Sequence, residues 1–164
     1  MIKVGIVSDT HGHTDDKLLK FFEGCGQIWH CGDIGTVAVI AALETVAPVI
    51  AVHGNIDGTE TRWNNPLFQS FKIEEVSVLI THIGGYPGKY SPEARILIEK
   101  YKPKIFLAGH SHILKVIPDR KNDLLFINPG AAGISGFHLV RTAIRLTIDG
   151  DKIKDLEVAE WQRK

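Results

Sequence analysis

Long apolar runs, signal sequences and basic tracts are all missing from this chain. No apolar run approaches the roughly 20 residues that a helix needs to cross a bilayer, and the N-terminus lacks a signal-peptide pattern. We therefore expect no membrane partner. The 19 basic residues are balanced by 19 acidic ones and form no run. A long nucleic acid is therefore not an expected partner either.

Cysteine is also scarce. Cys25 and Cys31 are the two cysteines of the chain, and the predicted strand between them would hold their Cα atoms roughly 20 Å apart. That distance excludes a disulfide within this segment. Free thiols and the missing targeting segment predict a cytoplasmic protein. Because no linker, repeat or low-complexity stretch interrupts the chain, we expect one domain over residues 1–164.

The apolar pattern changes character along the chain. In the first hundred residues predicted strands at 2–8, 27–31 and 49–53 alternate with helices, one capped by Thr14 and one over about 36–46. Such alternation favours parallel strands with helices outside.

The rest of the chain is rich in strands. We leave the interval 57–66 irregular, and expect strands at 67–74 and 76–82, a helix at 92–101, and strands at 104–108, 113–118, 124–127, 138–148 and 152–159. The strand-rich C-terminal half predicts a second sheet packed on the first. The expected fold is α/β (α+β), a four-layer αββα sandwich of two mixed sheets with helices outside.

Short polar motifs follow five of the predicted strands. In chain order they are Asp9-Thr-His11, Gly32-Asp33, Gly54-Asn55, His82 and Gly109-His110-Ser-His112. Strand ends are rigid, so these side chains can converge on one place. Carboxylate, imidazole and amide oxygen together suit Mn, Fe, Zn, Co or Ni, whereas Mg or Ca would take mostly oxygen. The motifs therefore predict a transition-metal pair, with Asp33 as the carboxylate bridge.

The ordered motifs resemble those of the calcineurin-like metallophosphoesterases. Their D-x-H, G-D, G-N, H and G-H-x-H motifs match Asp9/His11, Asp33, Asn55, His82 and His110/His112 in the same order. The resemblance covers essentially the whole chain. The small size and the stretch Asn128-Pro129-Gly130 are similar to the bacterial and archaeal phosphodiesterase branch.

The resemblance implies a ligand set and a reaction. The first ion would be held by Asp9, His11, Asp33 and His112, and the second by Asp33, Asn55, His82 and His110. Mn²⁺ is favoured, and Ni²⁺, Fe²⁺, Zn²⁺ and Co²⁺ are compatible. The implied activity is hydrolysis of small-molecule phosphodiesters by a hydroxide bridging the two ions. A homo-oligomer is compatible with the sequence.

One position departs from the family pattern. Many members carry G-N-H-D/E, whose histidine is taken to protonate the leaving group, but this chain has Ile56. We therefore predict activity on esters with acidic leaving groups, or with leaving groups protonated by water. Asn55 and Asp57 are the candidate catalytic residues. Asp57 would serve either as an outer partner of the ligands or as a substitute acid.

Two alternatives stay open at this point. One is a catalytically weak or inactive scaffold, as in the retromer subunit that shares this fold, and the other is a phosphomonoesterase. Four histidines lie outside the motifs: His13, His30, His53 and His138. We interpret them first as structural, with His30 and His53 also able to orient ligands through hydrogen bonds, and His13 close enough to the first motif to contact substrate.

Overall fold

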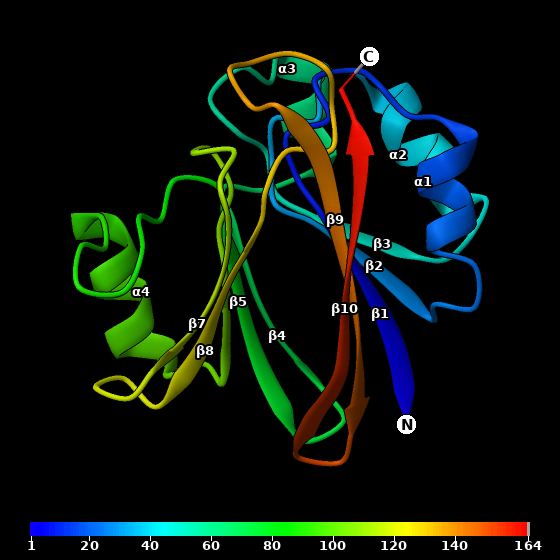
Figure 1. The fold of residues 1–164 in the computed structure, drawn as a ribbon. Helices are drawn as coiled ribbons and strands as arrows, with labels where there is room; N and C mark the ends of the chain where they lie inside the picture. Colours follow the sequence, from blue (N-terminus) through cyan, green and yellow to red (C-terminus); the bar gives the residue numbers. More distant parts are fainter. Residues whose placement is uncertain (164) are drawn as a thin grey trace.

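Two five-stranded sheets lie face to face in the computed structural model, which describes residues 1–163 (Figure 1). The first sheet has the order β10-β9-β1-β2-β3. Its strands are β1 (Ile2–Val7), β2 (Gln27–His30), β3 (Val49–Ala51), β9 (Val140–Asp149) and β10 (Lys152–Gln162). Strands β1, β2 and β3 are parallel to one another, and β9 and β10 are added by antiparallel pairing.

The second sheet has the order β4-β5-β6-β8-β7. Its strands are β4 (Phe68–Ile73), β5 (Val76–Thr81), β6 (Ile105–Leu107), β7 (Leu114–Asp119) and β8 (Leu124–Pro129). The central strands β5, β6 and β8 are parallel, while β4 and β7 pair antiparallel at the two edges.

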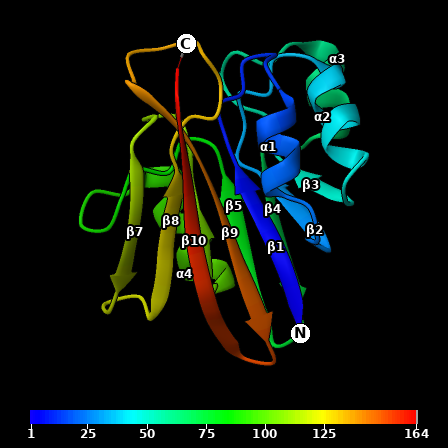
Figure 2. The same cartoon turned by 45° about the vertical axis from the view of Figure 1, so that its right-hand side comes forward.

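Helices cover the outer faces of the two sheets, as Figure 2 shows from a second side. On the first sheet, residues of α1 (Asp16–Phe21) and α2 (Val37–Glu44) share a buried apolar cluster with Val7 and Ile28. On the second sheet, α4 (Pro92–Tyr101) packs through Ala94 and Ile98 against Phe106. The short helix α3 (Thr59–Asn64) lies near one end of the sandwich.

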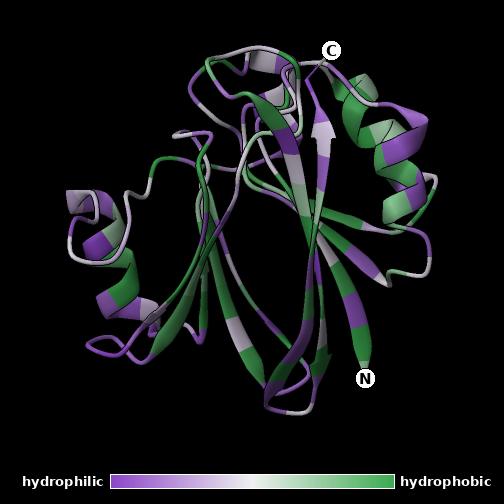
Figure 3. Cartoon of the chain, in the orientation of Figure 1, coloured by the Kyte–Doolittle hydropathy of each residue, from purple (hydrophilic) through white to green (hydrophobic). Residues whose placement is uncertain are grey.

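The central core fills the space between the sheets. Residues from both inner faces form one apolar cluster, in which Val4, Trp29 and Ile144 of the first sheet meet Ile80 and Ile127 of the second. Figure 3 shows this composition as green strands in both sheets, with purple residues at the hairpin turn between β7 and β8. The predicted αββα sandwich is therefore confirmed.

Three details of the prediction are wrong. The last two strands, β9 and β10, extend the first sheet beside β1 instead of joining the second sheet. The interval predicted as irregular contains the helix α3. The first helix is capped by Asp15 and not by Thr14, because the Asp15 carboxylate accepts the Leu18 N–H at 3.1 Å.

Both cysteines are free, as predicted, and both are buried. Within residues 1–163, none of the helices has the length and apolar character needed to cross a membrane.

Candidate metal centre

The loops that carry the polar motifs gather at one end of the sandwich, where β1, β2, β3, β5 and β6 end (Figures 1 and 2). Backbone hydrogen bonds tie neighbouring loops together. Asp9 N–H donates to the Gly32 carbonyl at 2.9 Å, and His11 N–H donates to the Asp33 carbonyl at 3.0 Å. The Gly109 N–H donates to the His82 carbonyl at 2.9 Å. These backbone bonds act within the loops of each sheet. Two bonds that involve side chains join the loops of the two sheets, because the His110 N–H donates to Asp9 Oδ2 at 3.1 Å and His82 Nδ1 lies 2.7 Å from the Cys31 carbonyl oxygen.

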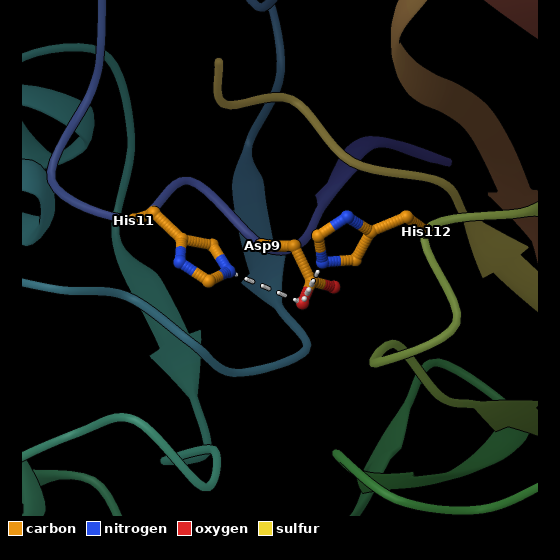
Figure 4. A group of neighbouring side chains, drawn as sticks. All are labelled: Asp9, His11 and His112. Atoms are coloured by element: carbon orange, nitrogen blue, oxygen red, sulfur yellow. Dashed lines mark ion pairs between the residues drawn. The ribbon is translucent and has the colours of Figure 1, made fainter. Parts of the chain in front are cut away.

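Six of the seven predicted ligands form two compact groups. Asp9, His11 and His112 make the first, and Asp33, His82 and His110 make the second; in each group the potential ligand atoms lie within 4.8 Å of one another. Figure 4 shows the His11 and His112 rings pointing from opposite sides at one Asp9 oxygen. That oxygen, Oδ1, is 3.8 Å from His11 Nε2 and 3.1 Å from His112 Nε2.

Asp33 lies between the two groups. Its Oδ2 is 3.5 Å from His11 Nε2, in the first group, and 3.3 Å from His82 Nε2, in the second. Asn55, the seventh predicted ligand, reaches the second group through its Oδ1, which is 3.0 Å from His110 Nδ1. The structure therefore brings all seven side chains together, with one carboxylate placed where it can serve both groups.

Several ligand atoms are buried and lack a hydrogen-bond partner. They are Asp9 Oδ1, His11 Nε2 and His82 Nε2. The other Asp9 oxygen, Oδ2, accepts from Ser8 Oγ at 2.6 Å and from the His110 N–H at 3.1 Å. Buried polar atoms are rarely left without a partner in proteins. These atoms face one another at the middle of the site, as expected for ligands of a cation.

Local backbone geometry supports the same interpretation. Nine non-glycine residues among those described have positive φ, and five of them are predicted ligands: Asp9, His11, Asp33, His110 and His112. Such conformations cost energy and concentrate at functional sites. The close approach of neighbouring loops also requires glycine at two positions. A β-carbon at Gly54 would collide with Asp33, and one at Gly109 would collide with Ser8.

The charges of the site stabilise one another. Burial raises the pKa of Asp9, but the His11 and His112 imidazoles and the charge of His82 outweigh it and hold the pKa well below its usual range. For His82, burial lowers the pKa, but the nearby Asp33 and Asp9 carboxylates outweigh burial and raise the pKa above its ordinary value. The carboxylate of Asp9 is therefore held ionised, and the two carboxylates together favour positive charge placed between them, such as that of a bound cation.

The donor set fits divalent transition-metal ions. Imidazole nitrogens, carboxylate oxygens and one amide oxygen suit such ions. His82 is also fixed in the orientation that a ligand needs. Its Nδ1 lies 2.7 Å from the Cys31 carbonyl oxygen, which can only accept, so Nδ1 carries the hydrogen and Nε2 faces the site.

Asp57 sits behind the ligand loops. Its side chain is buried, and its two oxygens accept the backbone N–H groups of Ile34, Gly35 and Gly54 at 3.1, 2.8 and 2.8 Å. These bonds brace the segments that follow Asp33 and precede Asn55. The geometry favours the supporting role of Asp57 over the alternative of a substitute acid, because both oxygens are engaged as acceptors.

Ile56 lies at the surface of the site. Its backbone N–H donates to Asp33 Oδ1 at 3.1 Å, which leaves Asp33 Oδ2 for the two ligand groups. Ile56 is 47 % exposed. The position at which the resemblance implied a histidine is therefore open to solvent but holds an apolar side chain.

Among the histidines outside the motifs, two contact the site network. His30 is buried, with Nε2 3.0 Å from Thr10 Oγ1 and Nδ1 accepting the Gly32 N–H at 3.1 Å. His138 packs against the predicted ligand His112, with ring centroids 5.1 Å apart. His53 instead bonds the Asn65 carbonyl, and His13 lies 3.5 Å from Asp15. The contact of His138 was missed by sequence reasoning, because nothing in the pattern links positions 26 residues apart.

Comparison with known proteins agrees with the geometry. A family model described as the calcineurin-like phosphoesterase superfamily domain matches residues 2–151. The chain is similar to a probable metallophosphoesterase of Methanothermobacter thermautotrophicus, with 29 % identity covering 94 % of this chain and 90 % of the relative. It is also similar to a phosphodiesterase of Methanocaldococcus jannaschii, with 30 % identity covering 79 % of this chain and 83 % of the relative.

Solved structures show the same fold. An archaeal phosphodiesterase superposes with a TM-score of 0.76 and 26 % identity, covering 96 % of this chain and all of the other. Vps29 from Entamoeba histolytica, solved in complex with Zn²⁺, has a TM-score of 0.75 at 18 % identity, covering 99 % of this chain and 100 % of that one. At that level of identity, the second likeness concerns the fold alone.

Proposed function

Because the chain belongs to the calcineurin-like phosphoesterase superfamily, we propose that it is a dinuclear metal-dependent phosphodiesterase acting on small-molecule substrates. The observation that carries the proposal is the pair of ligand groups on either side of Asp33, with three buried ligand atoms that lack any other partner. We further propose Mn²⁺ as the ion and the cytoplasm as the place of action.

Each ligand has a role in this proposal. The first ion is held by Asp9, His11, Asp33 and His112, and the second by Asp33, Asn55, His82 and His110. Once bound, such a pair lowers the pKa of a bound water and draws phosphate oxygens toward positive charge. Asn55 turns its amide oxygen toward His110, which leaves its amide nitrogen to donate to a phosphoryl oxygen.

The leaving group receives no proton from position 56, where many family members carry a histidine. Ile56 cannot donate one, and the oxygens of Asp57 are engaged by backbone N–H groups. A positioned general acid typically contributes about 10²–10⁴-fold. The enzyme should therefore prefer esters whose leaving group is acidic enough to depart as an anion, or one that water can protonate.

Diesters are the favoured substrates. A phosphodiester carries one negative charge on its phosphoryl group, while a monoester carries up to two. A site without its own acid should therefore hydrolyse the less charged diester more readily. The similarity to a curated relative and to a solved structure that are both named as phosphodiesterases supports the same choice. An inactive scaffold is the competing interpretation, and the substitution at Ile56 is its main support.

Turnover of aryl phosphates with added Mn²⁺ tests the proposal. We expect Mn²⁺-dependent hydrolysis of bis-p-nitrophenyl phosphate that is faster than hydrolysis of p-nitrophenyl phosphate. Asp33→Asn should lower it by about 100-fold or more, because charge stabilisation by the ions is worth several kcal/mol. Asp123→Asn is the control, since Asp123 is exposed and, within residues 1–163, forms an ion pair only with Lys104.

Two results would contradict the proposal. Faster cleavage of the monoester would make the protein a phosphomonoesterase. No Mn²⁺-dependent turnover of either ester would favour the scaffold.

A further inference from the structure

His138 contacts a predicted ligand without belonging to the ligand set. It lies on the loop between β8 and β9, and its Nδ1 is 3.3 Å from Nδ1 of His112. Its other ring nitrogen, Nε2, is 2.7 Å from the Gly133 carbonyl oxygen. His138 therefore stands between a backbone carbonyl and a ligand imidazole.

The hydrogen positions along this chain of contacts follow from the chemistry of the groups. A carbonyl oxygen can only accept, so His138 Nε2 must carry a hydrogen. Neutral His138 then offers a lone pair at Nδ1, and the hydrogen between the two rings must belong to His112 Nδ1. Neutral His112 is left with its lone pair on Nε2, the atom that lies 3.1 Å from Asp9 Oδ1.

The loop that carries His138 is fastened to the loop of the first motif. The Gly133 N–H donates to the Asp9 carbonyl at 3.1 Å, and the Ala132 N–H donates to the Ser8 carbonyl at 2.9 Å. The contacts thus close a ring that runs from Asp9 through Gly133, His138 and His112 back to Asp9. Gly136 lies against the His112 ring so closely that a β-carbon there would collide with it.

We propose that His138 is a positioning residue for the first metal ion, holding His112 with its hydrogen on Nδ1 and its Nε2 directed at the ion. This inference rests on the metal site of the proposed function and assigns a role that the family motifs do not contain. His82 in the second group is oriented in the same way by the Cys31 carbonyl. At His112 a side chain performs this task, so the contact can be removed by substitution of His138.

Titration with Mn²⁺ alone tests the proposal. His138→Leu removes the acceptor while keeping an apolar side chain of similar size, and His138→Asn restores an acceptor at the position of Nδ1. Loss of a partner behind a metal ligand typically weakens metal binding about 10–100-fold. In His138→Leu we expect this loss of affinity for one of the two ions, while the second ion binds as in the wild type. In His138→Asn we expect most of the lost affinity to be recovered. Phe137→Ala, on the same loop and fully exposed, should bind both ions normally.

The state of the ring is measurable without metal. Nitrogen-15 chemical shifts of the metal-free protein should show His112 with its hydrogen on Nδ1, and His138→Leu should shift the ring toward the other tautomer. Unchanged affinity for both ions together with unchanged shifts in His138→Leu would overturn the proposal. Equal losses in His138→Asn and His138→Leu would also overturn it. Failure of the wild type to bind two ions or to cleave diesters would count against the proposed function, and the shifts would still decide the role of His138.

Discussion

At the scale of single residues, the two central carboxylates divide their oxygens between the surrounding protein and the site. Asp9 Oδ2 accepts from Ser8 and from the His110 N–H, while Asp33 Oδ1 accepts from the Ile56 N–H. The remaining oxygen of each faces imidazoles. This division fixes both side chains before any ion arrives, so little ordering remains to be done on binding.

Replacement of Ile56 tests the account of the missing acid. Ile56→His places an imidazole at an exposed position beside Asn55. It should raise turnover of an alkyl phosphodiester more than that of an activated aryl diester, because the alkyl leaving group needs a proton and the aryl one does not. Ile56→Gln, which is polar but donates no proton as an acid, is the control. An unchanged ratio of alkyl to aryl turnover in Ile56→His would contradict the account.

Replacement of Asp57 separates its two interpretations. In Asp57→Asn, an amide N–H₂ group meets backbone N–H donors where an oxygen stood, so at least one buried donor loses its partner. We expect a loss of about 1–3 kcal/mol in the free energy of unfolding, measured by urea denaturation. The exposed Asp151→Asn serves as the control. Wild-type stability combined with a large loss of turnover would instead favour Asp57 as the acid.

Residue types and their order were enough to predict that these seven side chains lie together, because each motif follows a strand that ends at the same end of the sandwich. The contacts behind the ligands could not be predicted in this way. Asp57 braces loops that are distant in sequence, and His138 reaches His112 through a loop with no recognisable pattern. Such partners depend on how loops pack, and loop packing leaves no periodic signal.

At the scale of secondary-structure elements, α1 lies directly on the strand that carries the first motif. Phe22, the residue at the end of α1, is fully buried, and its ring occupies the space beside Gly5 of β1. The glycine thus allows the helix to approach the sheet closely. That approach positions the loop between β1 and α1, which holds Asp9 and His11.

A side chain at Gly5 should disturb this packing. A β-carbon there would lie 2.5 Å from Phe22 Cδ1, too close for a real contact. Gly5→Ala should therefore lower the free energy of unfolding by about 1–3 kcal/mol, measured by urea denaturation. Phe22→Leu should lower the free energy of unfolding less in the Gly5→Ala variant than in the wild type. Wild-type stability of Gly5→Ala would show that the ring is free to move aside.

Hydrophobic periodicity was enough to predict most helices and strands, but it could not predict the order of the strands within the sheets. The pattern of β9 and β10 is that of ordinary antiparallel strands, and it contains no signal that would direct them to β1 in place of the second sheet. The helix α3 was missed because it spans only Thr59–Asn64 and has little apolar periodicity.

At the scale of the whole molecule, the burial of His30 links stability to pH. Desolvation lowers the pKa of His30 from 6.5 to about 4 in the folded protein. Well above pH 6.5 the ring is neutral in both the folded and the unfolded state. As the pH falls below 6.5, the unfolded chain takes up a proton and the folded protein does not, so stability is lost.

The difference in unfolding free energy between the wild type and His30→Gln isolates this effect. For the metal-free proteins, we expect the free energy of unfolding to fall by about 2 kcal/mol more in the wild type than in His30→Gln when the pH is lowered from 7 to 5. Urea denaturation at the two values measures it. A difference that does not change with pH would mean that His30 keeps its ordinary pKa in the folded protein.

The central claim is that two divalent cations lie side by side in this fold and share Asp33. Anomalous scattering from crystals of the protein grown with Mn²⁺ tests it most directly. The account predicts two peaks about 3.5–4 Å apart, one beside Asp9, His11 and His112 and the other beside His82 and His110, with Asp33 between them. A single peak, a peak elsewhere in the molecule, or ligand side chains turned away from one another in saturating Mn²⁺ would contradict it.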